Sequence, residues 1–172
     1  MKNKFFFSLV YFSILLTLFS QNNNYTLKAN ISYYENSASK LDSYINERCL
    51  LDVYYPNNIK NFATVVWFHG GGLTGGEKFI PQELKEKGIA VVAVNYRLSP
   101  KAKSPSYIND AAAAVAWVFK NIAEFGGDTK LIFVSGHSAG GYLSAMIGLD
   151  KKWLNQFAIN SKNIAAIIPF SG

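Results

Sequence analysis

Blocks of consecutive apolar residues recur along the chain and alternate with segments of a different periodicity. Four such blocks, rich in Val, Ile and Ala, occupy residues 63–68, 89–94, 131–134 and 164–168. Short apolar runs without polar alternation are typical of strands that are buried on both faces. Residues 49–55 alternate imperfectly and precede Pro56, which predicts a half-exposed strand that ends in a turn.

The longest segment between these strands has the spacing of a helix. Apolar side chains recur there at alternating steps of three and four residues, at Ile108, Ala111, Val115, Val118 and Ile122. This spacing gives a helix one apolar face. We expect Ser104 to cap the helix, Pro105 to begin it, and Gly126 with Gly127 to end it.

Two shorter helices complete the alternation. One is expected over residues 81–87, closed by Gly88, and one begins near residue 139, with Leu143, Met146 and Ile147 on its inner side. Buried strands that alternate with helices imply an α/β fold, with a mostly parallel sheet and helices on both faces.

The first twenty residues have the composition of a secretory signal. Lys2 and Lys4 precede an apolar run over residues 5–19, and the small Ser20 is followed by polar residues. We therefore expect a signal peptide and a secreted or periplasmic protein. An uncleaved membrane anchor is the alternative, because the run is close to the shortest that spans a bilayer.

Composition favours one globular domain, since 49% of the residues are hydrophobic and 16% are charged. We expect a signal peptide over residues 1–20, an N-terminal segment over 21–45 that leads into the domain, and a partial domain over 46–172. Cys49 is the single cysteine, which excludes an internal disulfide. We expect it to pack as a small apolar side chain in a strand.

The charge pattern argues against a nucleic-acid partner. The formal charge of +6 includes Lys2 and Lys4, so the chain without its first twenty residues carries +4. The lysines are scattered, without a dense basic stripe interleaved with aromatic residues. After signal cleavage we expect no stable membrane association, and the pattern gives no indication of the oligomeric state.

The stretch Gly136-His137-Ser138-Ala139-Gly140 joins a predicted strand to a predicted helix. In a G-x-S-x-G sequence the serine occupies a strained turn, and a side chain at either glycine would collide with the neighbouring strand and helix. Such a turn lifts the Ser138 hydroxyl above the carboxyl end of the sheet. It also presents the N–H of Ala139 at a helix N-terminus, where a developing oxyanion is stabilised.

A second glycine-rich stretch, His69-Gly70-Gly71-Gly72, directly follows another buried strand. Three consecutive glycines let backbone N–H groups approach a substrate carbonyl that side chains would obstruct. A flexible turn is the alternative interpretation. Two such motifs, each at the carboxyl end of a buried strand, favour a shared site.

The chain resembles an α/β-hydrolase of the esterase and lipase group, near the hormone-sensitive-lipase-like carboxylesterases and the bacterial feruloyl or acetyl esterases. The resemblance rests on residues 51–54, 67–72, 95–100, 127–128 and 136–141. It covers roughly residues 46–172, the amino-terminal half to two-thirds of that fold, so the sequence predicts an α/β-hydrolase fold truncated before its last strands.

The resemblance implies roles for individual residues. Ser138 is the implied nucleophile, and the N–H groups of Gly71, Gly72 and Ala139 are the implied oxyanion hole. Five further residues support these motifs: His69, Gly70, Gly136, His137 and Gly140. The resemblance implies no metal and no organic cofactor.

The family's acid and base follow the serine in the order Ser, then Asp or Glu, then His. Here Asp150 is the only acidic residue after Ser138, and no histidine follows it. Two earlier carboxylates do not replace them. Asp128 precedes a buried strand, on the order of 15 Å from its carboxyl end, and Asp110 is more simply a structural carboxylate near a helix start.

The two histidines are also better explained without a catalytic role. His137 is adjacent to Ser138, so its side chain should leave the turn in another direction and pack locally. His69 begins the glycine-rich stretch, where we expect it to hold that loop by hydrogen bonds. The residues therefore supply a nucleophile without an evident base.

We interpret the chain as part of a secreted serine hydrolase that cleaves carboxylic esters through an acyl-enzyme on Ser138, present without the C-terminal acid and base. Family analogy favours acetyl, feruloyl or other short acyl esters, on small molecules or on polysaccharide. Two alternatives stay open: a catalytically inactive binding protein or degenerate fragment, and an amidase or formamidase of the same fold. Residues 164–170 would form an uncovered apolar edge.

Overall fold

The computed structural model describes residues 24–34 and 42–172. The expected signal peptide over residues 1–20 lies outside these residues. Within the described ranges, no helix combines the length and the apolar character needed to cross a membrane.

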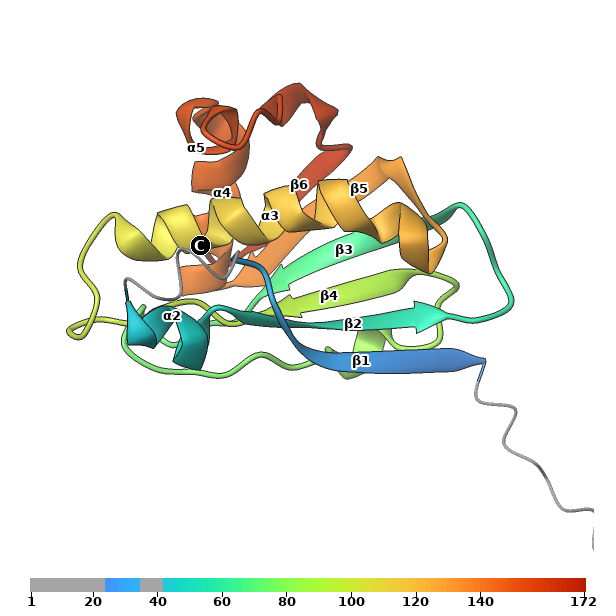
Figure 1. Cartoon of the computed structure of the whole chain (residues 1–172), viewed down its shortest axis with the longest axis horizontal. Coiled ribbons are helices and arrows are strands. Elements are labelled where there is room, and N and C mark those ends of the chain that lie inside the picture. Colours follow the sequence, from blue (N-terminus) through green and yellow to red (C-terminus); the bar gives the residue numbers. More distant parts are fainter. Residues whose placement is uncertain (1–23, 35–41) are drawn as a thin grey trace, which may run out of the picture.

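Six strands form one sheet in the order β1-β2-β4-β3-β5-β6 (Figure 1). Their bounds are β1 Tyr25–Ser32, β2 Leu50–Pro56, β3 Phe62–Phe68, β4 Ala90–Val94, β5 Gly127–His137 and β6 Ala166–Phe170. Strands β4, β3, β5 and β6 are parallel, whereas β2 runs antiparallel to both β4 and β1. The expected mostly parallel sheet is confirmed. The carboxyl ends of the four parallel strands therefore lie side by side at the same end of the sheet.

The predicted strands differ from the observed ones mainly at their ends. β5 extends beyond the expected 131–134 in both directions, and β6 begins two residues later than the expected 164–168. The Ala165 N–H still donates to Ile132 O at 2.8 Å, so pairing with β5 begins just before the strand. As expected, β6 lies at the sheet edge with apolar side chains uncovered, since Ile168 and Phe170 are exposed.

The long helix α3, Ser106–Phe125, packs on one face of the sheet through the predicted apolar stripe. All five side chains of that stripe are buried. Gly126 ends the helix with φ 100°, a left-handed conformation that glycine adopts without strain. The expected start is wrong, because Pro105 occupies the N-cap position and no side chain caps the helix, so neither Ser104 nor Pro105 has the expected place.

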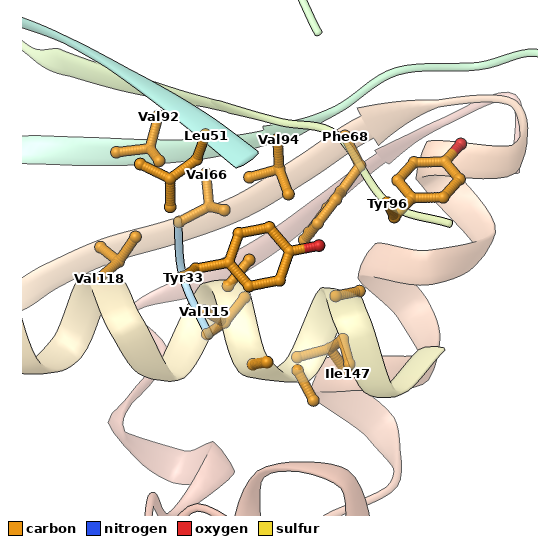
Figure 2. Packing of buried hydrophobic residues seen from close by; sticks show 14 of the residues in the cluster. Tyr33, Leu51, Val66, Phe68, Val92, Val94, Tyr96, Val115, Val118 and Ile147 are labelled. Carbon is orange, nitrogen blue, oxygen red and sulfur yellow. The ribbon is translucent and has the colours of Figure 1, made fainter. Parts of the chain in front are cut away.

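Helix α4, Ala139–Leu149, packs beside α3 on the same face of the sheet. Figure 2 shows the core between the sheet and these helices, where Val66 and Phe68 of β3 and Val92 and Val94 of β4 face Val115 of α3. Leu143 and Ile147 of α4 are buried as predicted, and Met146 is half-buried against the core. A short helix α5, Lys152–Asn155, and a 3₁₀ turn η2, Ser161–Asn163, connect α4 to β6.

The other face of the sheet carries less regular structure. The helix expected over residues 81–87 is one 3₁₀ turn, η1, Gln82–Leu84. It stops because Lys85 is extended and Glu86 has φ 59°, so the helical turn ends three residues before the expected end at residue 87. In the described residues the helices that pack on the sheet, α3 and α4, therefore lie on one face.

The N-terminal segment is part of the domain. β1 pairs with β2, and the short helix α2, Ser43–Arg48, spans the expected boundary at residue 46. Cys49 is fully buried, but it is the C-cap of α2 and not a strand residue, which corrects the expectation. Strand β1, residues 25–32, thus belongs to the same sheet as β2–β6.

Asp110 is structural, as expected. Its carboxylate is fully buried and accepts hydrogen bonds from Arg97 Nε and Nη2 at 2.9 and 2.7 Å and from Tyr34 OH at 2.8 Å. Arg97 also donates to Asp42, the N-cap of α2, at 2.6 Å. This ion-pair network ties α2 to the first turns of α3.

Candidate active site

Ser138 is the single residue between β5 and α4. Its backbone has φ 53° and ψ −117°, a conformation that costs free energy in a residue with a side chain. The Ser138 N–H donates to Phe170 O at the end of β6, at 2.8 Å. The Ser138 hydroxyl makes no capping hydrogen bond to α4. The strand, strained serine and helix therefore follow one another as the G-x-S-x-G sequence predicts.

The two glycines of the motif let β3 pass directly against the turn. A Cβ atom added at Gly136 would lie 2.6 Å from Phe68 O and 2.6 Å from the Gly140 carbonyl carbon. One added at Gly140 would lie 2.0 Å from Phe68 O. The predicted collisions with the neighbouring strand and helix are thus confirmed, and they explain why both positions exclude side chains.

The glycine loop, residues 70–76, begins against the serine turn. A Cβ atom added at Gly70 would lie 3.5 Å from Ser138 Cβ and 3.1 Å from His137 O. Gly71 and Gly72 are exposed and have φ 116° and 62°. The structure therefore brings together two motifs that are separated by more than sixty residues in the sequence.

This arrangement can stabilise negative charge beside Ser138. Ala139 is the first residue of α4, and the first N–H groups of a helix have no acceptor within it. The helix dipole adds positive potential at the same end. Gly71 O accepts from the Thr74 and Gly75 N–H groups, both at 3.1 Å, which folds the loop into a tight turn. Backbone N–H groups on a preorganised loop are typical of oxyanion sites.

His69 holds the start of the glycine loop. Its ring is buried, and Nδ1 lies 2.6 Å from Gly70 O, which makes Nδ1–H the donor. Tyr96 stacks on this ring at 4.4 Å between centroids, and its hydroxyl donates to His69 O at 2.8 Å. His69 Nε2 is buried with no hydrogen-bond partner among the described residues.

Burial lowers the pKa of His69, and the positive charge of Arg48 lowers it further, against the opposing effects of the Gly70 carbonyl and Glu77. In the unfolded chain the His69 imidazole binds a proton below about pH 6.5, whereas in the folded chain it stays neutral to a lower pH. Folding stability is therefore lost as the pH falls below about 6.5. We expect urea unfolding to show lower stability at pH 5.5 than at pH 7.5.

The His69→Asn variant tests the origin of this pH dependence, because the asparagine amide can still donate to Gly70 O and does not titrate. We expect it to lose most of the dependence. The His137→Asn variant is the matched control, since His137 is exposed, and should retain it. Equal stability of the wild type at the two pH values would contradict the prediction.

The structure places no described carboxylate and histidine as a triad with Ser138. Asp128 accepts from the Lys130 N–H near the start of β5, at the opposite end from Ser138. Asp150 is the C-cap of α4, about 18 Å along the helix from Ser138, and pairs with Lys152. In the part of the chain that is described, no group of His, Cys, Asp and Glu side chains could hold a metal ion.

His137, which we expected to leave the turn in another direction and pack locally, is exposed and lines an apolar cavity of about 570 Å³ on the face of the sheet away from α3. Trp67, Phe79 and Phe170 line the same cavity, and Phe170 pairs with His137 in the strand register. The 3₁₀ turn η1 also contributes to the cavity, through Glu83 and Leu84.

The loop is also held by a residue that no sequence pattern marks. Arg48 donates to Gly76 O at 2.9 Å and to Tyr96 O at 3.2 Å. Tyr96 lies in one of the stretches that carry the family resemblance, but Arg48 is a lone charge in a polar segment. Only the folded structure places this side chain beneath the glycine loop.

The sheet topology, the strained serine turn and the glycine loop together define an α/β-hydrolase fold. A family model described as BD-FAE matches residues 51–172, and the chain belongs to this family.

Similar proteins agree with this assignment. The probable carboxylic ester hydrolase LipM of Mycobacterium tuberculosis is 38% identical over 111 residues, which are 60% of this chain and 26% of LipM. A truncated form of a carbohydrate esterase from gut microbiota is 28% identical with a TM-score of 0.60, over 74% of this chain and 45% of that one. Esterase B from Lactobacillus rhamnosis shares the fold, with a TM-score of 0.67 at 22% identity, over 85% of this chain and 48% of that one.

The chain thus spans about a quarter of the curated relative and less than half of either solved structure.

Proposed function

We propose that this chain provides the nucleophile and the oxyanion site of a carboxylic ester hydrolase, and that residues outside these 172 provide the acid and the base. One observation carries the proposal: Gly70 lies against Ser138, so the glycine loop and the N-terminus of α4 both lie beside the serine. The relatives that carry ester hydrolase names support the same reaction class.

In the proposed reaction, the Ser138 hydroxyl attacks the ester carbonyl carbon while the base takes its proton. The carbonyl oxygen becomes an oxyanion, which the N–H groups of Gly71, Gly72 and Ala139 stabilise. The alcohol leaves with a proton returned by the base, and the acyl group stays on Ser138. Water then attacks the acyl-enzyme, releases the carboxylic acid and restores the serine.

We propose a secreted or periplasmic protein that acts on acetyl, feruloyl or other short acyl esters. The signal-like residues 1–20 support the location. The similarity to a carbohydrate esterase supports an ester carried on polysaccharide, by analogy.

The test compares hydrolysis of p-nitrophenyl acetate with that of p-nitroacetanilide by the purified chain. Without a base, the oxyanion site and binding still accelerate acyl transfer by roughly 10³-fold over water. We therefore expect slow ester cleavage at about that level and no measurable cleavage of the anilide.

The control is the same chain after thermal unfolding. It loses the site but keeps every lysine, so it measures the background reaction of lysine amines with the activated ester. Ester cleavage equal to that of the unfolded control would overturn the proposal. Preferential cleavage of the anilide would favour the amidase alternative instead. Tight binding of an ester without any cleavage would favour the inactive binding protein.

A further inference from the structure

A buried arginine contacts the end of the glycine loop. Arg48, the last residue of α2, is 6% exposed. Its Nη2 donates to Gly76 O and its Nε to Tyr96 O, while Nη1 pairs with the Glu77 carboxylate. The three guanidinium nitrogens therefore contact three places: the last residue of the loop, the residue that follows the loop, and the segment that follows β4. Hydrogen bonds from a charged donor are stronger than those between neutral groups.

The same arginine reaches the start of the loop through Tyr96. Tyr96 is fully buried beside Phe68, at the end of the core cluster (Figure 2). Its hydroxyl donates to His69 O, and His69 in turn holds Gly70 O. Arg48 is thus bonded directly to the end of the loop at Gly76, and it is linked to the start of the loop by hydrogen bonds that Tyr96 and His69 join.

The two ends of the loop also touch one another. A Cβ atom added at Gly76 would lie 2.4 Å from Gly70 O and 2.4 Å from His69 Nδ1. A displacement of Gly76 toward Gly70 would therefore displace Gly70, which lies against Ser138. Fixing the end of the loop fixes its position relative to the serine.

The chain beyond the loop is fastened to the end of β4. Asn95 Nδ2 donates to Glu77 Oε2 at 2.6 Å, and the Lys78 N–H donates to Asn95 Oδ1 at 2.6 Å. Asn95 itself is buried. Glu77 is largely exposed, with 71% of its side chain accessible, so the ion pair with Arg48 reaches from the interior to the surface.

We propose that Arg48 is a positioning residue for the oxyanion site, acting through Gly76 and Tyr96 to set where the Gly71 and Gly72 N–H groups lie relative to Ser138. The inference deepens the proposed function and rests on it, since it assigns these N–H groups their role. α2 lies upstream of the matched region 51–172, so the site depends on a segment outside that region.

The first measurement is amide hydrogen exchange of the full chain, which needs no catalytic activity. The Thr74 and Gly75 N–H groups both donate to Gly71 O and so report the shape of the loop. We expect Arg48→Met to accelerate their exchange at least about tenfold, because charge-assisted hydrogen bonds are lost. Exchange in the buried strand β4 should change far less.

Two further variants keep this test decisive. Lys101→Met is the matched control, because Lys101 contacts α2 through an exposed ion pair with Glu47 and through the ring of Tyr44, and not through the glycine loop. Its exchange should equal that of the wild type. Glu77→Gln removes the ion pair by changing its exposed partner. We expect this variant to accelerate exchange of the Thr74 and Gly75 amides about threefold, a result that does not depend on whether Arg48→Met folds. Unchanged exchange in Glu77→Gln and in a folded Arg48→Met would overturn the proposal.

The second measurement separates positioning from general stability. A fluorophosphonate modifies Ser138 with a maximal rate and an apparent binding constant. We expect Arg48→Lys to lower the maximal rate about tenfold at an unchanged binding constant. In Arg48→Ala, we expect added guanidinium ion to restore part of the maximal rate, whereas added urea should not restore it. If the reagent modifies the wild type, and the maximal rates of Arg48→Lys and Arg48→Ala equal the wild-type rate, the inference is overturned and the proposed function stands. No modification of the wild type would instead count against the proposed function.

Discussion

Replacing Ser138 by alanine will abolish covalent modification of the chain by a fluorophosphonate. The reagent forms a bond to the serine oxygen, and the strained turn, the Gly70 contact and the N-terminus of α4 distinguish this oxygen from other hydroxyls. With an acid and a base present, the same change should lower kcat by about 10⁶, as removal of a nucleophile does in well-studied serine hydrolases. Intact-protein mass and peptide mapping after long incubation measure the effect.

The matched control is Ser144→Ala, in the helix α4 that follows Ser138. The Ser144 hydroxyl is buried and donates to Gly140 O at 2.8 Å, so it is not available to a reagent. We expect this variant to be modified on Ser138 like the wild type. Modification spread equally over several serines would show that the turn does not activate Ser138.

Gly140→Ala will destabilise the fold by at least about 3 kcal/mol, at the upper end of the range for overpacking. The added methyl carbon would lie 2.0 Å from Phe68 O and 2.9 Å from His69 O, and both contacts are with backbone. A side-chain rotation cannot relieve them, so β3 or α4 must shift. For a chain of this size we expect the melting temperature to fall by roughly 6–12 °C.

Gly75→Ala is the control for this prediction. Gly75 lies in the exposed loop, and a Cβ atom added there meets nothing within 4 Å. We expect its stability to stay within about 1 kcal/mol of the wild type. A melting temperature of Gly140→Ala equal to that of Gly75→Ala would contradict the packing argument.

The features predicted well from sequence are those that short-range chemistry determines. The apolar runs predict the bounds of β3 and β4 to within one residue, because a parallel strand buried on both faces tolerates few polar residues. The five-residue stripe of α3 is buried as its spacing requires. At the site, the strained conformation of Ser138 follows from the flanking glycines.

The features that sequence could not predict depend on contacts between distant segments. The helix expected at 81–87 has helix-forming residues, but Glu86 adopts a left-handed conformation there. The expected cap at Ser104 fails because the turn that precedes α3 places Pro105 at the N-cap. Arg48 reaches Gly76, which is 28 residues away, and no local pattern encodes that contact.

The hydrogen bond from the Ser138 N–H to Phe170 O makes the nucleophile conformation depend on the last strand of the sheet. A backbone strained by about 1–3 kcal/mol persists only while its surroundings hold it, and edge strands are among the first elements to open locally. Fraying of β6 and relaxation of the serine turn should therefore be one event. A molecule or segment that pairs with β6, the outermost strand among the described residues, would then raise the fraction of time for which Ser138 is ready to react.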